Sequence, residues 1–152
     1  MWLVEERCED AFRAYLRVTV PGDMRVYVGF TDDELQFPCV VCHAASSDNE
    51  NDEALFNGHR RVAVEIAVMT EATPELDSSG VMIRSSRDRN AMARGNVMAA
   101  LAKEALHEDL NDMNVPGIKF SMAHTTEVTR SVEGMNFVSM INVDVIANPV
   151  VI

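Results

Sequence analysis

The chain has 152 residues, of which 47% are hydrophobic and 24% charged, a composition typical of one soluble domain with a sizeable core. Its 24 acidic residues outnumber the 13 lysines and arginines, and the formal net charge of −11 argues against tight binding to nucleic-acid phosphates. The sequence lacks a run of about 18 apolar residues, and residues 1–6 do not read as a secretory signal, so we expect synthesis in the cytoplasm without membrane insertion.

The first half of the chain predicts one helix and three strands. Residues 3–17 place apolar side chains at helical spacing, with charged residues between them. Strands are predicted at 24–30, at 37–44 and at 60–70; the second is apolar enough to be central in a sheet. The helix is expected to bury Val4, Cys8, Ala11, Phe12, Tyr15 and Leu16, and the third strand Val62, Val64, Ile66 and Val68.

The second half predicts one long helix, followed by strands. Residues 86–113 are rich in strong helix formers, with Ser85, Ser86 or Asp88 as the cap and Asn114 with Pro116-Gly117 as the stop. Further strands are predicted at 118–123, 125–132 and 137–147, with a turn at Glu133-Gly134. The stripe expected to face the sheet from this helix is Met98, Leu101, Ala105, Leu106, Leu110 and Met113.

Two polar stretches, 45–58 and 71–85, are predicted as loops. Strands and helices do not alternate regularly, which favours an α+β fold: a mixed, mostly antiparallel sheet covered by the long central helix and the N-terminal helix. We expect a single domain over residues 1–152.

The run Cys39-Val40-Val41-Cys42-His43 matches the attachment pattern of c-type haem. However, this segment is predicted as a strand, in which residues three apart point to opposite faces. The two thiols would then be unable to serve one haem, metal or dithiol, and buried free cysteines are the favoured interpretation. A haem or thiol redox protein remains an alternative, and a metal site at Cys39 and His43 has little support.

The histidines at 43, 59, 107 and 124 form no metalloprotease pattern, and the chain has no nucleophile elbow, phosphate-binding loop or paired-carboxylate motif. We therefore predict no catalytic, cofactor-binding or metal-binding residues, no cofactor and no enzymatic activity. A small-molecule enzyme is a third class of function, with no feature in its favour.

Arginines cluster near the start of the long helix, at Arg84, Arg87, Arg89 and Arg94, opposed there only by Asp88. Either this is a solvated basic face or an anionic partner sits against it. We hypothesise head-to-tail contacts between copies, which close into a ring. The predicted interface comprises Arg84, Arg87 and Arg89, the acids Asp48, Glu50, Asp52 and Glu53, and the apolar patch Val81, Met82 and Ile83.

The order of these elements resembles the tail terminator (tail completion, neck) proteins of tailed bacteriophages. The resemblance spans the whole chain: an amphipathic helix at 4–16, a Pro-led strand at 37–41, an alternating strand at 61–69, a long helix at 90–110, and a hairpin of 125–132 with 137–145. It is a resemblance of order and texture, without a short motif. The haem-like run and the apolar residues 150–152 are not features of the family.

The resemblance implies a structural virion protein that forms a ring, typically a hexamer, on the head-proximal end of the tail tube. Such a ring ends tube polymerisation and joins the tail to the head connector. Its partners would be further copies of itself, the tail tube protein and the connector or head-closure protein, while DNA passes through without specific binding. A head-closure or connector protein of the neck is the nearest alternative.

Overall fold

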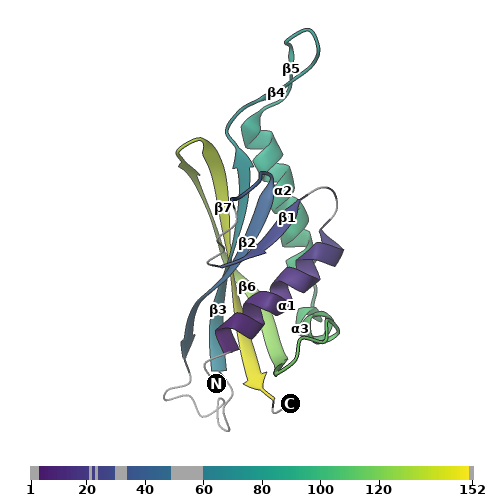
Figure 1. The fold of residues 1–152 in the computed structure, drawn as a ribbon, viewed down its shortest axis with the longest axis vertical. Helices are drawn as coiled ribbons and strands as arrows, with labels where there is room; N and C mark the ends of the chain where they lie inside the picture. Colours follow the sequence, from purple (N-terminus) through teal and green to yellow (C-terminus); the bar gives the residue numbers. More distant parts are fainter. Residues whose placement is uncertain (1–3, 21, 23, 30–33, 49–59, 151–152) are drawn as a thin grey trace.

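The structure, a computed structural model, describes residues 4–20, 22, 24–29, 34–48 and 60–150. Within these residues the chain forms three helices and seven strands, arranged as Figure 1 shows. In chain order they are α1 (Val4–Thr19), β1 (Arg25–Val28), β2 (Cys39–Asp48), β3 (Arg60–Glu71), β4 (Glu75–Leu76), β5 (Met82–Arg84), α2 (Ser86–Leu101), α3 (Leu106–Asn111), β6 (Ile118–Glu133) and β7 (Asn136–Pro149).

Five strands form the main sheet, in the order β1-β2-β3-β7-β6. Only β1 and β2 pair in parallel; the other neighbours are antiparallel. The helices pack on one face of this sheet (Figure 1), where the buried side chains of β2, β3 and β7 gather. The predicted α+β fold with a mixed, mostly antiparallel sheet is therefore confirmed.

The two clearest periodic segments fold as predicted. The helix predicted at 3–17 is α1, and all six side chains expected to be buried are buried. In β3 the side chains of Val62, Val64, Ile66 and Val68 are fully buried, while the residues between them are partly exposed. The alternation follows from the two-residue period of a strand with one covered face.

The single helix predicted over 86–113 is wrong, because the chain breaks between α2 and α3. At about 100° per residue, the buried positions of α2 and those of α3 would point about 160° apart on one continuous helix. A straight helix could not place both sets on the sheet, so the break lets Leu106 and Leu110 turn inward. Met98, expected on the buried stripe, is 36% exposed. The buried positions are Asn90, Val97, Ala100 and Leu101 in α2, and Leu106 and Leu110 in α3.

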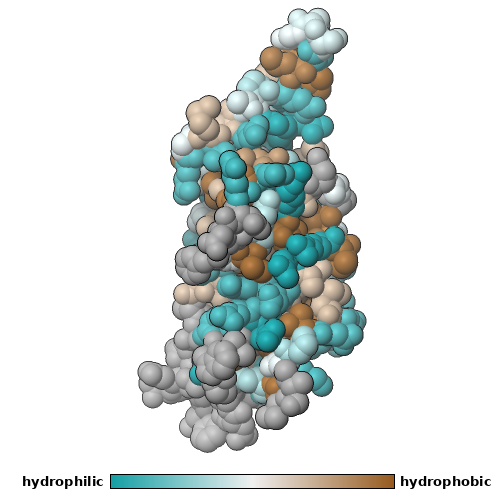
Figure 2. Space-filling view, in the orientation of Figure 1, coloured by the Kyte–Doolittle hydropathy of each residue, from teal (hydrophilic) through white to brown (hydrophobic). Residues whose placement is uncertain are grey.

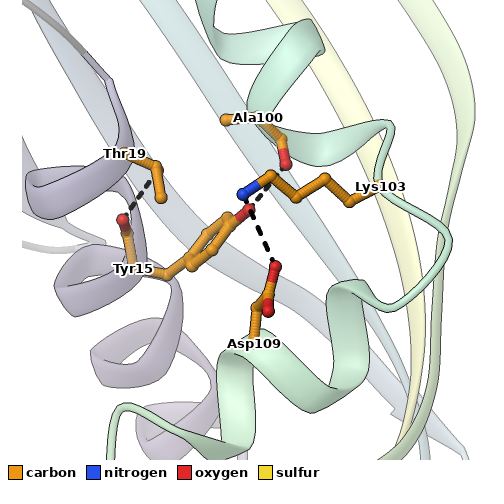
Figure 3. Close-up of polar contacts among 5 residues, drawn as sticks. All are labelled: Tyr15, Thr19, Ala100, Lys103 and Asp109. Carbon is orange, nitrogen blue, oxygen red and sulfur yellow. Dashed lines mark hydrogen bonds and ion pairs between the residues drawn. The ribbon is translucent and has the colours of Figure 1, made fainter.

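A hydrogen bond from α1 accommodates this break (Figure 3). The Tyr15 hydroxyl donates to the Ala100 carbonyl oxygen at 2.7 Å, which satisfies one of the last carbonyls of α2. Lys103 Nζ lies 5.8 Å from the centre of the Tyr15 ring and 3.6 Å from the Asp109 carboxylate. One tyrosine therefore connects α1, the end of α2 and α3.

The strand boundaries also differ from the prediction. The two strands predicted at 118–123 and 125–132 are one strand, β6, which pairs with β7 along its length and shifts register at two bulges. The predicted loop at 45–58 begins as strand, because β2 continues to Asp48 in register with β3; residues 49–59 lie outside the described residues. The second predicted loop, 71–85, contains the hairpin of β4 and β5.

Candidate assembly surface

The hairpin of β4 and β5 forms a separate two-stranded sheet that projects past one end of the main sheet, at the top of Figure 1. We call residues 75–84 the arm. Four large apolar side chains on it are between 53% and 61% exposed: Leu76, Val81, Met82 and Ile83. Figure 2 shows hydrophobic residues gathered on this projection. Exposed apolar patches on such a projection are typical of protein interaction sites.

The turn of the arm is held by hydrogen bonds within it. The Asp77 carboxylate accepts from the Ser79 hydroxyl at 2.7 Å, the Ser79 amide at 2.9 Å and the Val81 amide at 2.9 Å. These bonds, the Ser79 hydroxyl first, lower the pKa of Asp77. Gly80 takes the positive φ of 83° that the turn needs. The apolar side chains are thus presented by a built hairpin.

The base of the arm is attached to the body by Arg89. Its guanidinium donates to the carbonyl oxygens of Glu71 and Thr73, and the Ala72 amide donates to Met135 O at 2.7 Å. The Ser85 hydroxyl caps α2 by accepting from the Asp88 amide at 3.1 Å, which confirms one of the three predicted caps. Arg89, predicted to face a second copy, contacts the backbone of its own chain.

The arginines predicted as one cluster lie on two sides of α2. Arg84 and Arg89 line a cavity of about 460 Å³ at the base of the arm, together with Glu71 and Glu75. Arg87 and Arg94 line a second groove, of about 300 Å³, which also contains Arg130 from β6. Sequence reasoning missed Arg130, because only the pairing of β6 with β7 brings it beside α2.

Of the predicted acidic partners, Asp48 is the one that the structure describes, and it lies away from these arginines. Asp48 ends β2 opposite Arg61, at the end of the sheet far from the arm. Glu50, Asp52 and Glu53 are outside the described residues. The two halves of the predicted interface therefore do not meet at Asp48 within one molecule, and their contact stays a prediction about neighbouring copies.

The haem-like run lies on β2, as predicted from its β-branched residues. Cys42 packs in the main core with Val40 and Ala44, whereas Cys39, on the other face, is not part of that cluster. Burial raises the pKa of Cys39 to about 11 and that of Cys42 to about 12, and it also raises the pKa of Cys8. All three thiols are buried and free, and they remain protonated at neutral pH.

His43, the last residue of the run, lies beside α1: its Nδ1 atom is 4.0 Å from Glu9 Oε2. The Ala44 amide donates to the same carboxylate at 3.4 Å, and burial raises the pKa of Glu9. Within the described ranges, no three His, Cys, Asp or Glu side chains are close enough to hold a metal ion together. The described residues also include no helix long and apolar enough to cross a membrane.

A scan against protein-family models found no match, and a search of curated proteins found none either.

Proposed function

We propose that this protein is a structural component of a bacteriophage virion that forms a ring at the head-proximal end of the tail tube. There it ends tube polymerisation and presents a surface to the head connector. The copies are made in the host cytoplasm and pack head to tail, as a hexamer in the form typical of the family that the sequence resembles. The protein acts through shape and charge, with no catalytic step.

The observation that carries this proposal is the arm. Its apolar side chains, Leu76, Val81, Met82 and Ile83, are more than half exposed, although the hairpin that holds them is internally bonded. Exposed apolar area of this kind is stabilised when a partner covers it. Because the arm projects from one end of an elongated molecule (Figure 1), the surface that covers it is expected on a neighbouring copy.

Ring formation follows from the kind of contact proposed. When one end of a copy contacts a different surface of the next, the contact is heterologous; it gives a ring when the rotation between copies closes and an open filament when it does not, and we propose the closed form. The net charge of −11 suits a ring through which DNA slides, since an acidic wall repels phosphates instead of gripping them. Neither nucleic-acid sequence recognition nor a membrane partner is part of this function.

The proposal is tested with purified full-length chain, alone and with tail tube protein. Native mass spectrometry and negative-stain electron microscopy should show a closed ring, and tubes grown with it should be shorter and capped at one end. A chain that stays monomeric at tens of micromolar would refute ring formation. Rings that bind a head connector and leave tube length unchanged would identify a head-closure or connector protein instead.

The visible absorption spectrum of the same purified protein tests the alternative function, a haem or thiol redox protein. We expect a colourless, metal-free protein, and a haem absorption band in the visible spectrum would overturn the structural function in favour of the alternative that uses Cys39, Cys42 and His43.

A further inference from the structure

Three arginines line a groove of about 300 Å³ between α2 and the β6–β7 hairpin. Arg87 and Arg94 come from α2, and Arg130 comes from β6. Phe137 and Val138 add apolar lining. No acidic residue is among the described residues that line the groove. The chain as a whole has a net charge of −11, so this groove is a local region of positive charge that would attract an anionic ligand.

Arg94 and Arg130 are brought together by one buried residue, Ser139. The Ser139 hydroxyl donates to Asn90 Oδ1 at 2.6 Å and accepts from Arg94 Nη1 at 3.3 Å. Arg130 lies directly opposite Ser139 in the ladder between β6 and β7. Asn90 is itself fixed by a bond from its amide nitrogen to Phe137 O at 3.2 Å. Arg94 is therefore held by a buried hydrogen-bonded network, and Arg130 is placed next to that network by the register of the sheet.

The positive charge of the groove is not neutralised by the described part of the chain. The ion pairs among the described residues are formed by the carboxylates of Glu5, Glu9, Asp10 and Asp109. None of these ion pairs includes Arg87, Arg94 or Arg130. The first turns of α2 add the positive end of its macrodipole on the same side. Guanidinium groups bind carboxylate oxygens in pairs of parallel hydrogen bonds, so a carboxylate-rich partner fits this groove.

We propose that this groove binds the acid-rich segment 48–53 of a second copy of the chain. This inference deepens the proposed ring and rests on it. The segment carries Asp48, Glu50, Asp52 and Glu53 and no basic residue, which makes it complementary to the groove. The proposed contact keeps Arg87 from the interface predicted by sequence. It uses Arg94 and Arg130 in place of Arg84 and Arg89.

The backbone of the segment is too short to reach the groove of its own copy. In the sheet, the backbone of Asp48 lies opposite Arg61 of β3. Arg130 lies opposite Ser139 of β7, which in turn lies opposite Val68 of β3, seven residues beyond Arg61. Seven strand residues span about 23 Å, and the three steps from β2 to β6 add about 14 Å across the sheet. The five residues after Asp48 reach at most about 17 Å even when fully extended. The backbone of the segment therefore falls short of its own groove by about 10 Å, which favours a contact between copies.

A reciprocal charge swap tests this. Arg130→Glu and Asp52→Lys should each raise the concentration needed for half-assembly at least about tenfold, because each places like charges together in every contact. An equimolar mixture of the two variants should assemble nearly as well as the wild type, since an alternating ring pairs the introduced glutamate with the introduced lysine and leaves the other contacts native. Arg17→Glu, the same charge change at an exposed position on α1, is the matched control and should assemble normally.

Arg130→Gln, which removes the charge without reversing it, should give an intermediate effect, and circular dichroism checks that each variant is folded. If wild type forms rings and Arg130→Glu forms them equally well, the groove assignment fails and the ring proposal stands. If wild type is monomeric, both fail. If Arg130→Glu leaves assembly unchanged but abolishes binding to a short DNA duplex at low salt, the groove binds phosphates and the assignment is overturned.

Discussion

Replacing the apolar side chains of the arm should weaken assembly without weakening the fold. The variant is Val81→Ser/Met82→Ser/Ile83→Ser, at positions that are 61%, 59% and 61% exposed. Fully burying one such side chain is worth roughly 1.5–3 kcal/mol. Covering the remaining three-fifths of each in a contact between copies is then worth about 1–2 kcal/mol per side chain, or about 3–5 kcal/mol per contact.

Ordering the side chains at the interface offsets part of this gain, by about 0.5–1.5 kcal/mol for each flexible side chain that becomes fixed. The net loss, on the order of 1 kcal/mol, should raise the dissociation constant between copies by roughly five- to tenfold. The free energy of unfolding of the monomer should change by no more than about 0.5 kcal/mol, because these side chains already face solvent. Mass photometry over a concentration series measures the first quantity, and urea unfolding of the dilute monomer measures the second.

The control is Val18→Ser, which removes an apolar side chain that is 71% exposed on α1, away from the arm. It should leave both quantities unchanged. If the arm variant and wild type assemble over the same concentration range, the arm is not a contact between copies. The observation that carries the proposed function would then be lost.

Three further predictions concern the body of the molecule. Tyr15→Phe should lower the free energy of unfolding in urea by about 1–2 kcal/mol, because it leaves the buried carbonyl of Ala100 without its donor; no loss would show that water or another group replaces the hydroxyl. Burial raises the pKa of Cys39 to about 11 and that of Cys42 to about 12, so both thiols should resist a thiol reagent at pH 8 until urea unfolds the chain. Rapid labelling of the native protein would contradict this. For the same reason the free energy of unfolding should fall as the pH rises above the usual thiol pKa of 9.0. Glu9→Gln should raise the free energy of unfolding more at pH 7 than at pH 4, because burial raises the pKa of Glu9 and its ionised form costs stability once the pH exceeds that pKa. Urea unfolding of both proteins at the two pH values measures this. A variant that is less stable than the wild type at pH 7 would mean that the contact with His43 dominates.

The sequence predicts correctly those parts of the fold in which apolar residues recur at one regular spacing without interruption. In α1 the apolar spacing is helical from Val4 to Leu16, and in β3 it alternates from Val62 to Val68, so one rule places every buried side chain. The single helix predicted at 86–113 is wrong because the buried residues of this stretch form two stripes, on different helical faces. Nothing local marks the break, since Lys103, Glu104 and Ala105 are good helix formers; the need to bury Leu106 and Leu110 decides it.

The candidate site was predicted less completely, for a related reason. The apolar patch at Val81, Met82 and Ile83 is visible in the sequence. However, strands of two and three residues are too short to show a period, so the sequence predicts a loop where the structure has a hairpin. Composition alone also could not separate Arg89, which bonds the backbone at the base of the arm, from Arg87, which lines a groove. Arg130 joins that groove through long-range strand pairing.

The edges of the main sheet bear on why self-association would end in a ring instead of a fibre. A long, flat edge strand invites pairing with another chain, and β6 is both long and at the edge. However, its register shifts between Phe120 and Met122 and again between Thr125 and Glu127, where the Ser121 and Thr126 hydroxyls donate back to β7 carbonyls. Such bulges twist an edge and interrupt its ladder. The opposite edge, β1, has only four residues. Strand addition is therefore disfavoured at both edges, and the arm and the arginine groove are the described surfaces through which we propose that copies meet. Contacts of that kind join different surfaces at a fixed angle and can close on themselves.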